Sequence, residues 1–281
     1  MNRILSTIRR VRSASTKILA ATIVLLIAVA VSYRLHSTYQ NRAWWHDGPF
    51  FILNSEDLTL DIFRRDSAEW YTIALPRDVY TVVPGGYGLY PIGAIPELAK
   101  VEQKDSSFIL MSVATAIGLP IDSLAQTLQW WDRLALWRAQ RELTSDHEFI
   151  DLGSAIITRE EQRSDGSKVV KVDHEELARF YGIRFWDKAI VDEDLSIAVY
   201  NATDAEGVAG TVSRMLENIG VRVVESSNWA GDRPTTCVIV TTASSSETVT
   251  VRRIKQFFHC TIAVREEIPE RFDAQVVIGG W

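Results

Sequence analysis

Residues 195–225 read LSIAVYNATDAEGVAGTVSRMLENIGVRVVE, a stretch in which a strand, a helix and a second strand follow one another. An apolar run at 195–200 predicts a buried strand, and apolar residues at helical spacing over 208–219 predict a helix that ends at Gly220. A further apolar run at 221–225 predicts the second strand. Because a helix that joins two strands of one sheet usually makes a right-handed crossover between parallel strands, this stretch predicts an α/β domain.

The same alternation continues toward the end of the chain. Apolar runs predict strands at 237–242, 261–264 and 274–279, and a helix at 247–258 lies between the first two. We therefore expect the fold class α/β, with residues 195–281 forming a C-terminal α/β domain on a mostly parallel sheet.

A small α+β region is expected at 47–143. Four β-branched and aromatic segments between residues 50 and 83 predict the strands of a meander. The segment 84–88, PGGYG, predicts a flexible turn and lacks the Lys-Ser/Thr pair of a phosphate-binding loop. Helices are then predicted at 95–103, at 106–117, and from Asp122 or Ser123 to Leu143.

The third of these helices is rich in tryptophan. Its apolar residues form two adjacent stripes, one of Leu124, Leu128, Trp131 and Ala135 and the other of Trp130, Leu134 and Trp137. Two interpretations stay open: the stripes pack against the preceding strands, or the tryptophans contact the membrane interface.

Residues 144–194 are expected to form a hairpin and a connector. The hairpin covers 155–172 and turns at Asp165-Gly166. A short helix at 174–181 and a linker at 182–194 complete the segment.

The charge of the chain is distributed unevenly. It contains 30 Lys and Arg against 36 Asp and Glu, a formal net charge of -6 that argues against a dedicated nucleic-acid binder. Residues 1–46 hold seven of the basic residues and no acidic one, which leaves 23 basic and 36 acidic groups in the remainder. Such a basic, acid-free start is typical of the cytoplasmic end of a membrane segment.

An apolar run follows the basic leader: residues 18–33, ILAATIVLLIAVAVSY, are sixteen residues without a charge. A helix of this length spans about 24 Å, so flanking side chains must help it across a hydrocarbon core of roughly 30 Å. We expect a cytoplasmic leader at 1–17, a single transmembrane helix at 18–34 and an extracytoplasmic remainder anchored in the cell membrane. A cleaved signal peptide ending near Ala28-Val29-Ala30 is the alternative.

The C-terminal third resembles part of a known family. It contains IAVYNAT at 197–203, VRVVESSNW at 221–229 and AQVVIGG at 274–280. In this order the segments resemble the C-terminal domain of LytR-CpsA-Psr proteins, bacterial envelope proteins whose catalytic domain transfers glycopolymers from lipid pyrophosphate carriers to the cell wall. The resemblance implies a protein of the cell envelope.

Residues 51–122 resemble a reduced front half of that family's catalytic domain. LNSEDLTLDIF at 53–63, YTIALPRDVYTVVPG at 71–85 and GLPID at 118–122 are similar to the family's Ser-Asp-Thr-Ile, Ile-Pro-Arg-Asp and Gly-Ile-Pro-Ile-Asp segments. The resemblance places Asp57 at the carboxylate associated with metal, and Arg77 and Asp78 at the Arg-Asp pair near the pyrophosphate.

Other parts of the family's catalytic domain have no counterpart here. Pro91-Ile92-Gly93-Ala94 stands where the family has Lys-x-Asn-x-Ala, and the later half with its lipid tunnel has no room after Asp122. Loss of one charge-neutralising group from a phosphoryl-transfer site costs about 2 to 4 kcal/mol of barrier. We therefore expect a non-catalytic membrane-anchored protein, without a cofactor, that binds wall glycan, a lipid-linked precursor or an envelope partner.

The alternative function is a minimal phosphotransferase that moves a glycopolymer from a lipid pyrophosphate carrier to the cell wall. Its catalytic candidates are Asp57, Arg77 and Asp78, with Asp57 also the candidate metal ligand. Mg would then be the cofactor, because a cation and a guanidinium group together neutralise the charge of transferring phosphates.

Two cysteines complete the set of candidate residues. Cys237 and Cys260 each precede a predicted strand, and the helix between those strands would place the strands side by side. A disulfide and a pair of reduced, buried thiols both stay open, since adjacent parallel strands give mediocre disulfide geometry. The five histidines are scattered without zinc-site spacing.

Overall fold

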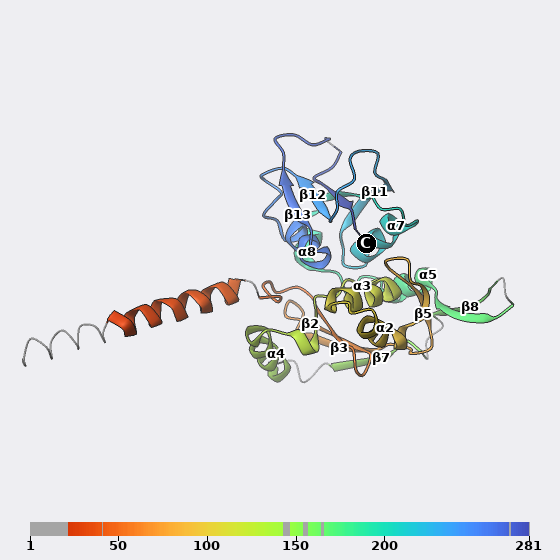
Figure 1. Ribbon diagram of the computed structural model, residues 1–281, viewed down its shortest axis with the longest axis horizontal. Coiled ribbons are helices and arrows are strands. Elements are labelled where there is room, and N and C mark those ends of the chain that lie inside the picture. Colours follow the sequence, from red (N-terminus) through yellow and green to blue (C-terminus); the bar gives the residue numbers. More distant parts are fainter. Residues whose placement is uncertain are drawn as a thin grey trace, which may run out of the picture.

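A computed structural model describes residues 22–40, 42–142, 147–153, 157–163, 166–269 and 271–280. An exposed helix, Thr22–Gln40, is long and apolar enough to cross a membrane. It projects from the body of the protein on the side where α4 (Trp130–Glu142) and α8 (Val249–Phe258) lie (Figure 1). The predicted leader at 1–17 and the first residues of the predicted span lie outside the described residues.

The first sheet contains the predicted meander. Its strand order is β6-β1-β2-β3-β7, and β1 to β3 are joined by antiparallel pairs as expected. These strands are β1 (Phe50–Asn54), β2 (Thr59–Arg64), β3 (Glu69–Ala74), β6 (Ser123–Leu124) and β7 (His147–Asp151). The fourth predicted strand leaves the meander and enters a second sheet of order β5-β4-β9-β8, made of β4 (Tyr80–Val83), β5 (Gly88–Pro91), β8 (Thr158–Gln162) and β9 (Lys168–Val172).

The segment 144–194 is more than the connector expected from the sequence. Its strand β7 pairs with β3, and β9 pairs with β4, so it completes both sheets of the first region. The predicted hairpin forms between β8 and β9, with Gly166 at φ 86° near its turn, whereas Asp165 lies outside the described residues. After α5 (His174–Tyr181), the predicted linker contains a further helix, α6 (Lys188–Glu193).

Two of the predicted helices form where expected, and the third is shorter. A 3₁₀ turn, η1 (Ile92–Ala94), leads into α2 (Ile95–Val101); α3 (Ser106–Ile117) is capped by the Asp105 side chain and ends at left-handed Gly118. The third helix, α4, begins only at Trp130. Ser123 and Leu124 pair instead with β1, and η2 (Ala125–Thr127) follows them, because pairing with the sheet outweighs local helix propensity.

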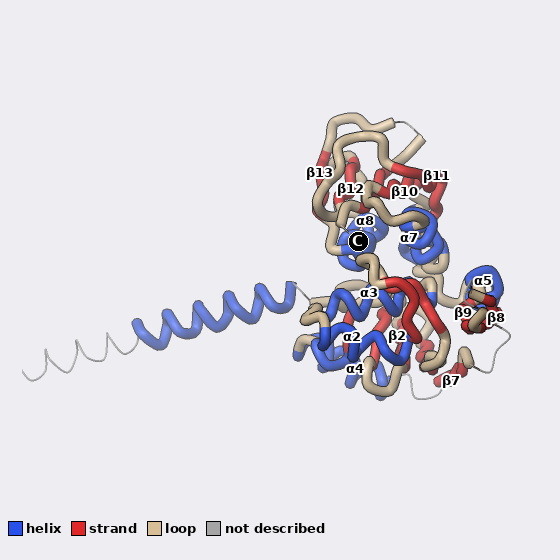
Figure 2. Tube along the Cα trace, turned by 45° about the vertical axis from the view of Figure 1, so that its right-hand side comes forward, coloured by secondary structure: helices blue, strands red, loops and turns tan. Residues whose placement is uncertain are grey.

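The C-terminal domain has the predicted α/β fold. Its sheet has the order β11-β10-β14-β12-β13, and three of the four pairings are parallel, whereas β12 and β14 run antiparallel. The elements are β10 (Ser196–Asn201), α7 (Val208–Glu217), β11 (Arg222–Asn228), β12 (Val238–Thr241), α8, β13 (Thr261–Val264) and β14 (Ala274–Ile278). Helices α7 and α8 lie on the side of this sheet that faces α3 (Figure 2).

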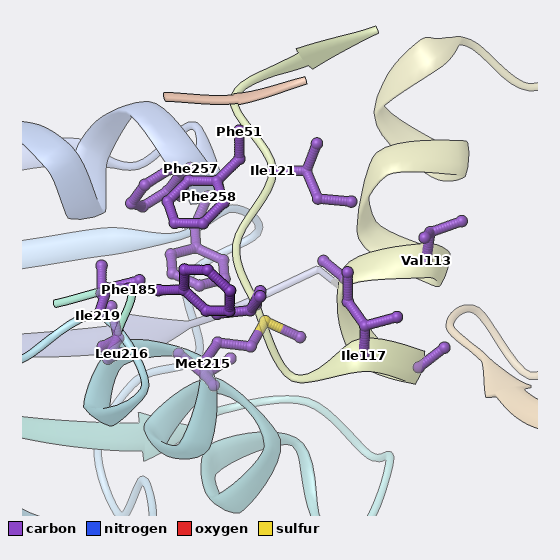
Figure 3. Close-up of a cluster of buried hydrophobic side chains, with 14 of the residues drawn as sticks. Phe51, Val113, Ile117, Ile121, Phe185, Met215, Leu216, Ile219, Phe257 and Phe258 are labelled. Carbon is purple, nitrogen blue, oxygen red and sulfur yellow. The ribbon is translucent and has the colours of Figure 1, made fainter. Parts of the chain in front are cut away.

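The two regions share one hydrophobic core. Met215 of α7 and Phe257 of α8 belong to the same buried cluster as Phe51 of β1, Ile121 and Phe185 (Figure 3). Because this core crosses the boundary between the regions, the first region and the C-terminal domain are expected to unfold together.

Candidate functional site

The predicted catalytic residues lie on the surface. Asp57, in the turn after β1, accepts a hydrogen bond of 2.8 Å from Asn54 Nδ2 and is exposed. Arg77 is also exposed and donates a 2.9 Å hydrogen bond to the carbonyl of Glu56, so the structure brings it to the turn that holds Asp57. Asp78 is exposed beside it.

The surroundings of this turn differ from a deep catalytic groove. One hollow borders this turn. It has a volume of about 350 Å³ and is lined by Glu56 with Lys100 and Lys104, and not by Asp57, Arg77 or Asp78. Such a volume is at the low end for small-ligand pockets. Within the described residues, no group of three or more His, Cys, Asp or Glu side chains is placed to hold a metal ion.

The segment Pro91-Ile92-Gly93-Ala94, where the resemblance would have placed Lys-x-Asn-x-Ala, packs directly on Arg77. Gly93 donates a backbone hydrogen bond of 2.9 Å to the Arg77 carbonyl. A Cβ at Gly93 would lie 3.0 Å from that oxygen, so the close approach depends on glycine. The segment thus supports the backbone of Arg77 and supplies no cation.

The chain between the exposed helix and β1 is packed into the body. Trp44 is only 2% exposed and stacks on Phe50 with ring centroids 5.1 Å apart. The backbone amides of Ala43 and Trp44 donate to the buried carboxylate of Asp132 on α4, at 3.1 and 3.0 Å. These contacts fix the body of the protein at the end of the helix.

Helix α4 has a buried side and an exposed tryptophan side. Its buried stripe is Asp132, Leu136 and Ala139, which is a different stripe from the two expected from the sequence. Trp130 and Trp137 remain 48% and 49% exposed. One side of the helix therefore packs, as the first interpretation expects, and the other side is exposed; membrane contact by these tryptophans stays a prediction.

Helix α4 also contacts the end of the exposed helix. Trp131 Nε1 donates a 3.2 Å hydrogen bond to Thr38 Oγ1, and the ring of Trp131 lies 5.4 Å from that of Tyr39 in an edge-to-face arrangement. The tryptophan-rich helix is therefore held beside the C-terminal end of the exposed helix.

A second hollow lies at the other side of that helix end. It has a volume of about 600 Å³, and its lining includes Gln40, the last residue of the exposed helix, and the basic residues Arg42, Arg252 and Lys255. Arg252 stacks over the ring of Trp45 at 4.0 Å, and Trp45 Nε1 donates a 2.6 Å hydrogen bond to Gln256. We call this hollow the basic hollow.

A buried ion pair joins the C-terminal domain to the first region. Asp122, whose side chain is fully buried, receives two hydrogen bonds from the Arg253 guanidinium, at 2.5 and 3.2 Å. Gln256 and the Phe51 amide donate to the same carboxylate at 2.7 and 2.9 Å. Burial raises the pKa of Asp122, while the charge of Arg253 and the hydrogen bonds from Arg253 and the Phe51 amide act in the opposite direction.

A histidine and a carboxylate form a second buried contact. His46 Nε2 lies 3.4 Å from Asp187 Oδ2, and Gly48 donates a 2.7 Å hydrogen bond to His46 Nδ1. Burial, and then the nearby Arg253 charge, lowers the pKa of His46 to about 3. Burial raises the pKa of Asp187. The imidazole is therefore neutral at physiological pH.

Because His46 is buried and neutral, we expect the stability of the folded protein to fall in acid. The unfolded chain binds a proton at His46 below about pH 6.5, but the folded protein does so only near pH 3, so stability falls as the pH falls through this window. The carboxyl of Asp187 acts in the opposite sense, since its raised pKa favours the folded protein at low pH. Between pH 7 and pH 5, His46 should contribute a loss of roughly 2 kcal/mol in the free energy of unfolding.

Urea unfolding of the full chain at both pH values measures this loss. His46→Gln should reduce it, and replacing the exposed His147 by glutamine should leave it unchanged. An equal pH dependence in the His46→Gln variant and the natural protein would contradict the assignment.

The structure joins Cys237 and Cys260 by a disulfide, with Cα atoms 4.4 Å apart. The two residues stand just before the paired parallel strands β12 and β13, as the sequence placed them. Of the two states left open from the sequence, the structure therefore contains the oxidised one.

Sequence reasoning missed the buried polar contacts. The sequence identified Asp122 only as the last residue of GLPID and as a possible helix start, and it assigned no role to Arg253. A signal for Arg253 existed: it lies four residues before Phe257, on the same face of the helix predicted at 247–258, where an unpaired charge would be costly.

The C-terminal domain matches a known protein family. Residues 194–280 match the family described as LytR cell envelope-related transcriptional attenuator. No curated protein matched the sequence.

Among solved structures the similarity is distant. TagT of B. subtilis is 11% identical, with a TM-score of 0.34 over 47% of this chain and 88% of that chain. A TagT structure with bound octaprenyl pyrophosphate lipid is 11% identical, with a TM-score of 0.29 over 47% and 86%. A transcriptional regulator from Enterococcus faecalis is 9% identical, with a TM-score of 0.36 over 62% and 89%. The comparisons thus relate residues 194–280 of this chain to the LytR cell envelope-related transcriptional attenuator family.

Proposed function

We propose that the protein is a non-catalytic, single-pass membrane protein of the cell envelope. It holds its LytR-type domain at the extracytoplasmic surface of the cell membrane and binds a lipid-linked envelope precursor there. The N-terminus lies in the cytoplasm, because the basic residues precede the apolar span and the acidic ones follow it. The family match of the C-terminal domain supports an envelope role.

The packed tether is the observation that carries this proposal. Trp44 is buried and Asp132 binds the Ala43 and Trp44 amides, so the described part of the tether, from residue 42 on, is packed against the body of the protein. A domain held in this way meets ligands at the membrane surface more readily than distant wall polymer. Of the three ligand classes considered, a lipid-linked precursor therefore fits best.

The exposed position of the candidate catalytic residues supports a binding role over transfer. Phosphoryl transfer depends on preorganised cationic groups in a site shielded from water. Arg77 and Asp57 instead lie on the open surface, with Gly93 packed beside Arg77.

A transfer and capture assay tests this function with the full chain purified in detergent. The chain should retain lipid-linked precursor from solubilised membranes and should transfer no glycopolymer to wall acceptor above the protein-free rate. Arg77→Ala and Asp57→Ala should change neither result. Transfer that falls about a hundredfold in Arg77→Ala would instead establish the phosphotransferase alternative.

A separate experiment tests on which side of the membrane the residues after the helix lie. Protease added to intact cells should remove peptides that follow the helix, such as those around the exposed strand β8, and should leave a membrane-bound fragment. Recovery of the intact chain in the soluble cytosol would contradict the membrane assignment.

A further inference from the structure

The basic hollow is a feature that the proposed function leaves unused. It lies at the junction of the exposed helix, the tether and helix α8, because Gln40, Trp45 and Lys255 all line it. We propose that it binds the headgroup of an anionic phospholipid from the bilayer that the helix crosses.

The position of the hollow matches the headgroup layer. Tyr33 ends the uncharged run, and Gln40 lies seven residues further along the helix, which is a rise of about 10 Å. The polar layer on each side of a bilayer is roughly 5 to 8 Å thick. For an upright helix, a hollow lined by Gln40 therefore lies about 2 to 5 Å beyond the outer edge of this layer, next to the lipid headgroups.

The tryptophans of α4 also indicate that the end of the exposed helix lies at the level of the lipid headgroups. Trp131 is bonded to Thr38, and Trp130 and Trp137 on the same helix are half exposed. Tryptophan favours the membrane–water interface because its ring is apolar and its N–H is polar. Elements on both sides of the helix end thus carry residues suited to the interface.

The charges of the hollow fit an anion. Arg42, Arg252 and Lys255 face one exposed carboxylate, Glu247, and the buried Asp122 is engaged by Arg253 and Gln256. Within the described part of the chain, neither Arg252 nor Lys255 forms an ion pair with a carboxylate. This basic surface stands out because the chain after residue 46 is strongly acidic.

The groups around the hollow are also held in place. Arg42 donates to the carbonyls of Tyr39, Trp44 and Trp45, which fixes its guanidinium where the chain leaves the helix. Arg252 is held against the Trp45 ring, whose N–H is bonded to Gln256. A phosphate that enters therefore meets positioned cations, which reduces the entropy lost on binding.

Native mass spectrometry of the full chain in nonionic detergent tests the site with added phosphatidylglycerol or phosphatidylcholine. The natural chain should retain phosphatidylglycerol preferentially. The double variant Arg252→Gln/Lys255→Gln should bind it about tenfold more weakly or worse, since each basic group near anionic lipid contributes on the order of 1 kcal/mol. The matched variant Lys168→Gln/Lys188→Gln, which removes the same charge from two exposed surface pairs, should bind it as the natural chain does.

Several results would overturn the proposal. Equal retention of the two phospholipids, or an unchanged affinity in Arg252→Gln/Lys255→Gln, would show that the hollow does not select an anionic headgroup. Displacement of phosphatidylglycerol by equimolar inorganic phosphate would show a site for free anions. Preferential retention of polyprenyl diphosphate would reject the phospholipid and leave the proposed function intact. Unchanged thermal melting of the double variant verifies that it is folded.

Discussion

Replacing Arg253 with leucine should lower the free energy of unfolding by about 3 to 5 kcal/mol, because the variant leaves the charge of Asp122 buried without its partner. Asp122 is inaccessible to water and would keep only the Gln256 and Phe51 donors. Urea unfolding of the full chain, followed by tryptophan fluorescence, measures the loss.

Two comparison variants make the result specific. Arg222→Leu removes a guanidinium from the half-exposed pair with Asp194 and should cost less than about 1 kcal/mol. The double variant Asp122→Leu/Arg253→Leu should be less destabilised than Arg253→Leu, since it removes both charges. Stability within 1 kcal/mol of the natural chain in Arg253→Leu would show that water or another group compensates Asp122.

The ion pair also decides how the two regions are joined. Asp122 follows the helix α3 segment, whereas Arg253 lies 131 positions later on α8, and the pair sits inside the shared core. Loss of the pair should therefore loosen the junction and not one region alone. Limited proteolysis of Arg253→Leu is expected to cut between the regions earlier than it cuts the natural chain.

Removal of the disulfide should give the second large effect. Cys237 and Cys260 are separated by 23 positions, and opening a loop of this size costs about 3 kcal/mol in the chain-entropy description. The variant Cys237→Ala/Cys260→Ala should show this loss in urea unfolding. A reductant should lower the stability of the natural chain and leave that of the variant unchanged.

The same bond has a chemical test. A thiol-blocking reagent should label neither cysteine of the unfolded natural chain before reduction and both afterwards. Labelling of both without reductant would mean that the two thiols are free, which is the other state compatible with the sequence.

Much of the fold followed from local pattern. The period of the apolar residues over 195–225 was sufficient for a strand, a helix and a second strand. The helix ends at Glu217, two residues earlier than expected, and Gly220 follows in the turn with a positive φ. The direction of β14 against β12 was not predictable in this way, because the long segment between β13 and β14 allows either direction. Pattern predicts elements well where one face must be buried, and it does not determine how distant strands pair.

The limits of local pattern are clear around α4. Leu124 and Leu128 fit the helical stripe that Trp131 continues, yet Leu124 lies in a strand because β1 presents an open edge to it. The resemblance gave Asp57 and Arg77 separate roles, and the structure adds that Arg77 bonds to the turn that holds Asp57 and that both are exposed.

The sequence by itself determined the uncharged N-terminal run, the acidic remainder and the alternation of strands and helices, since these depend on composition and on contacts between near neighbours. Only the tertiary structure decided that Asp122 meets Arg253, that His46 meets Asp187, and that Arg252 and Lys255 gather beside Gln40. Each of these groupings joins residues far apart in the chain. Which charged groups become buried together depends on the packing of the whole core, and no short window of sequence contains that information.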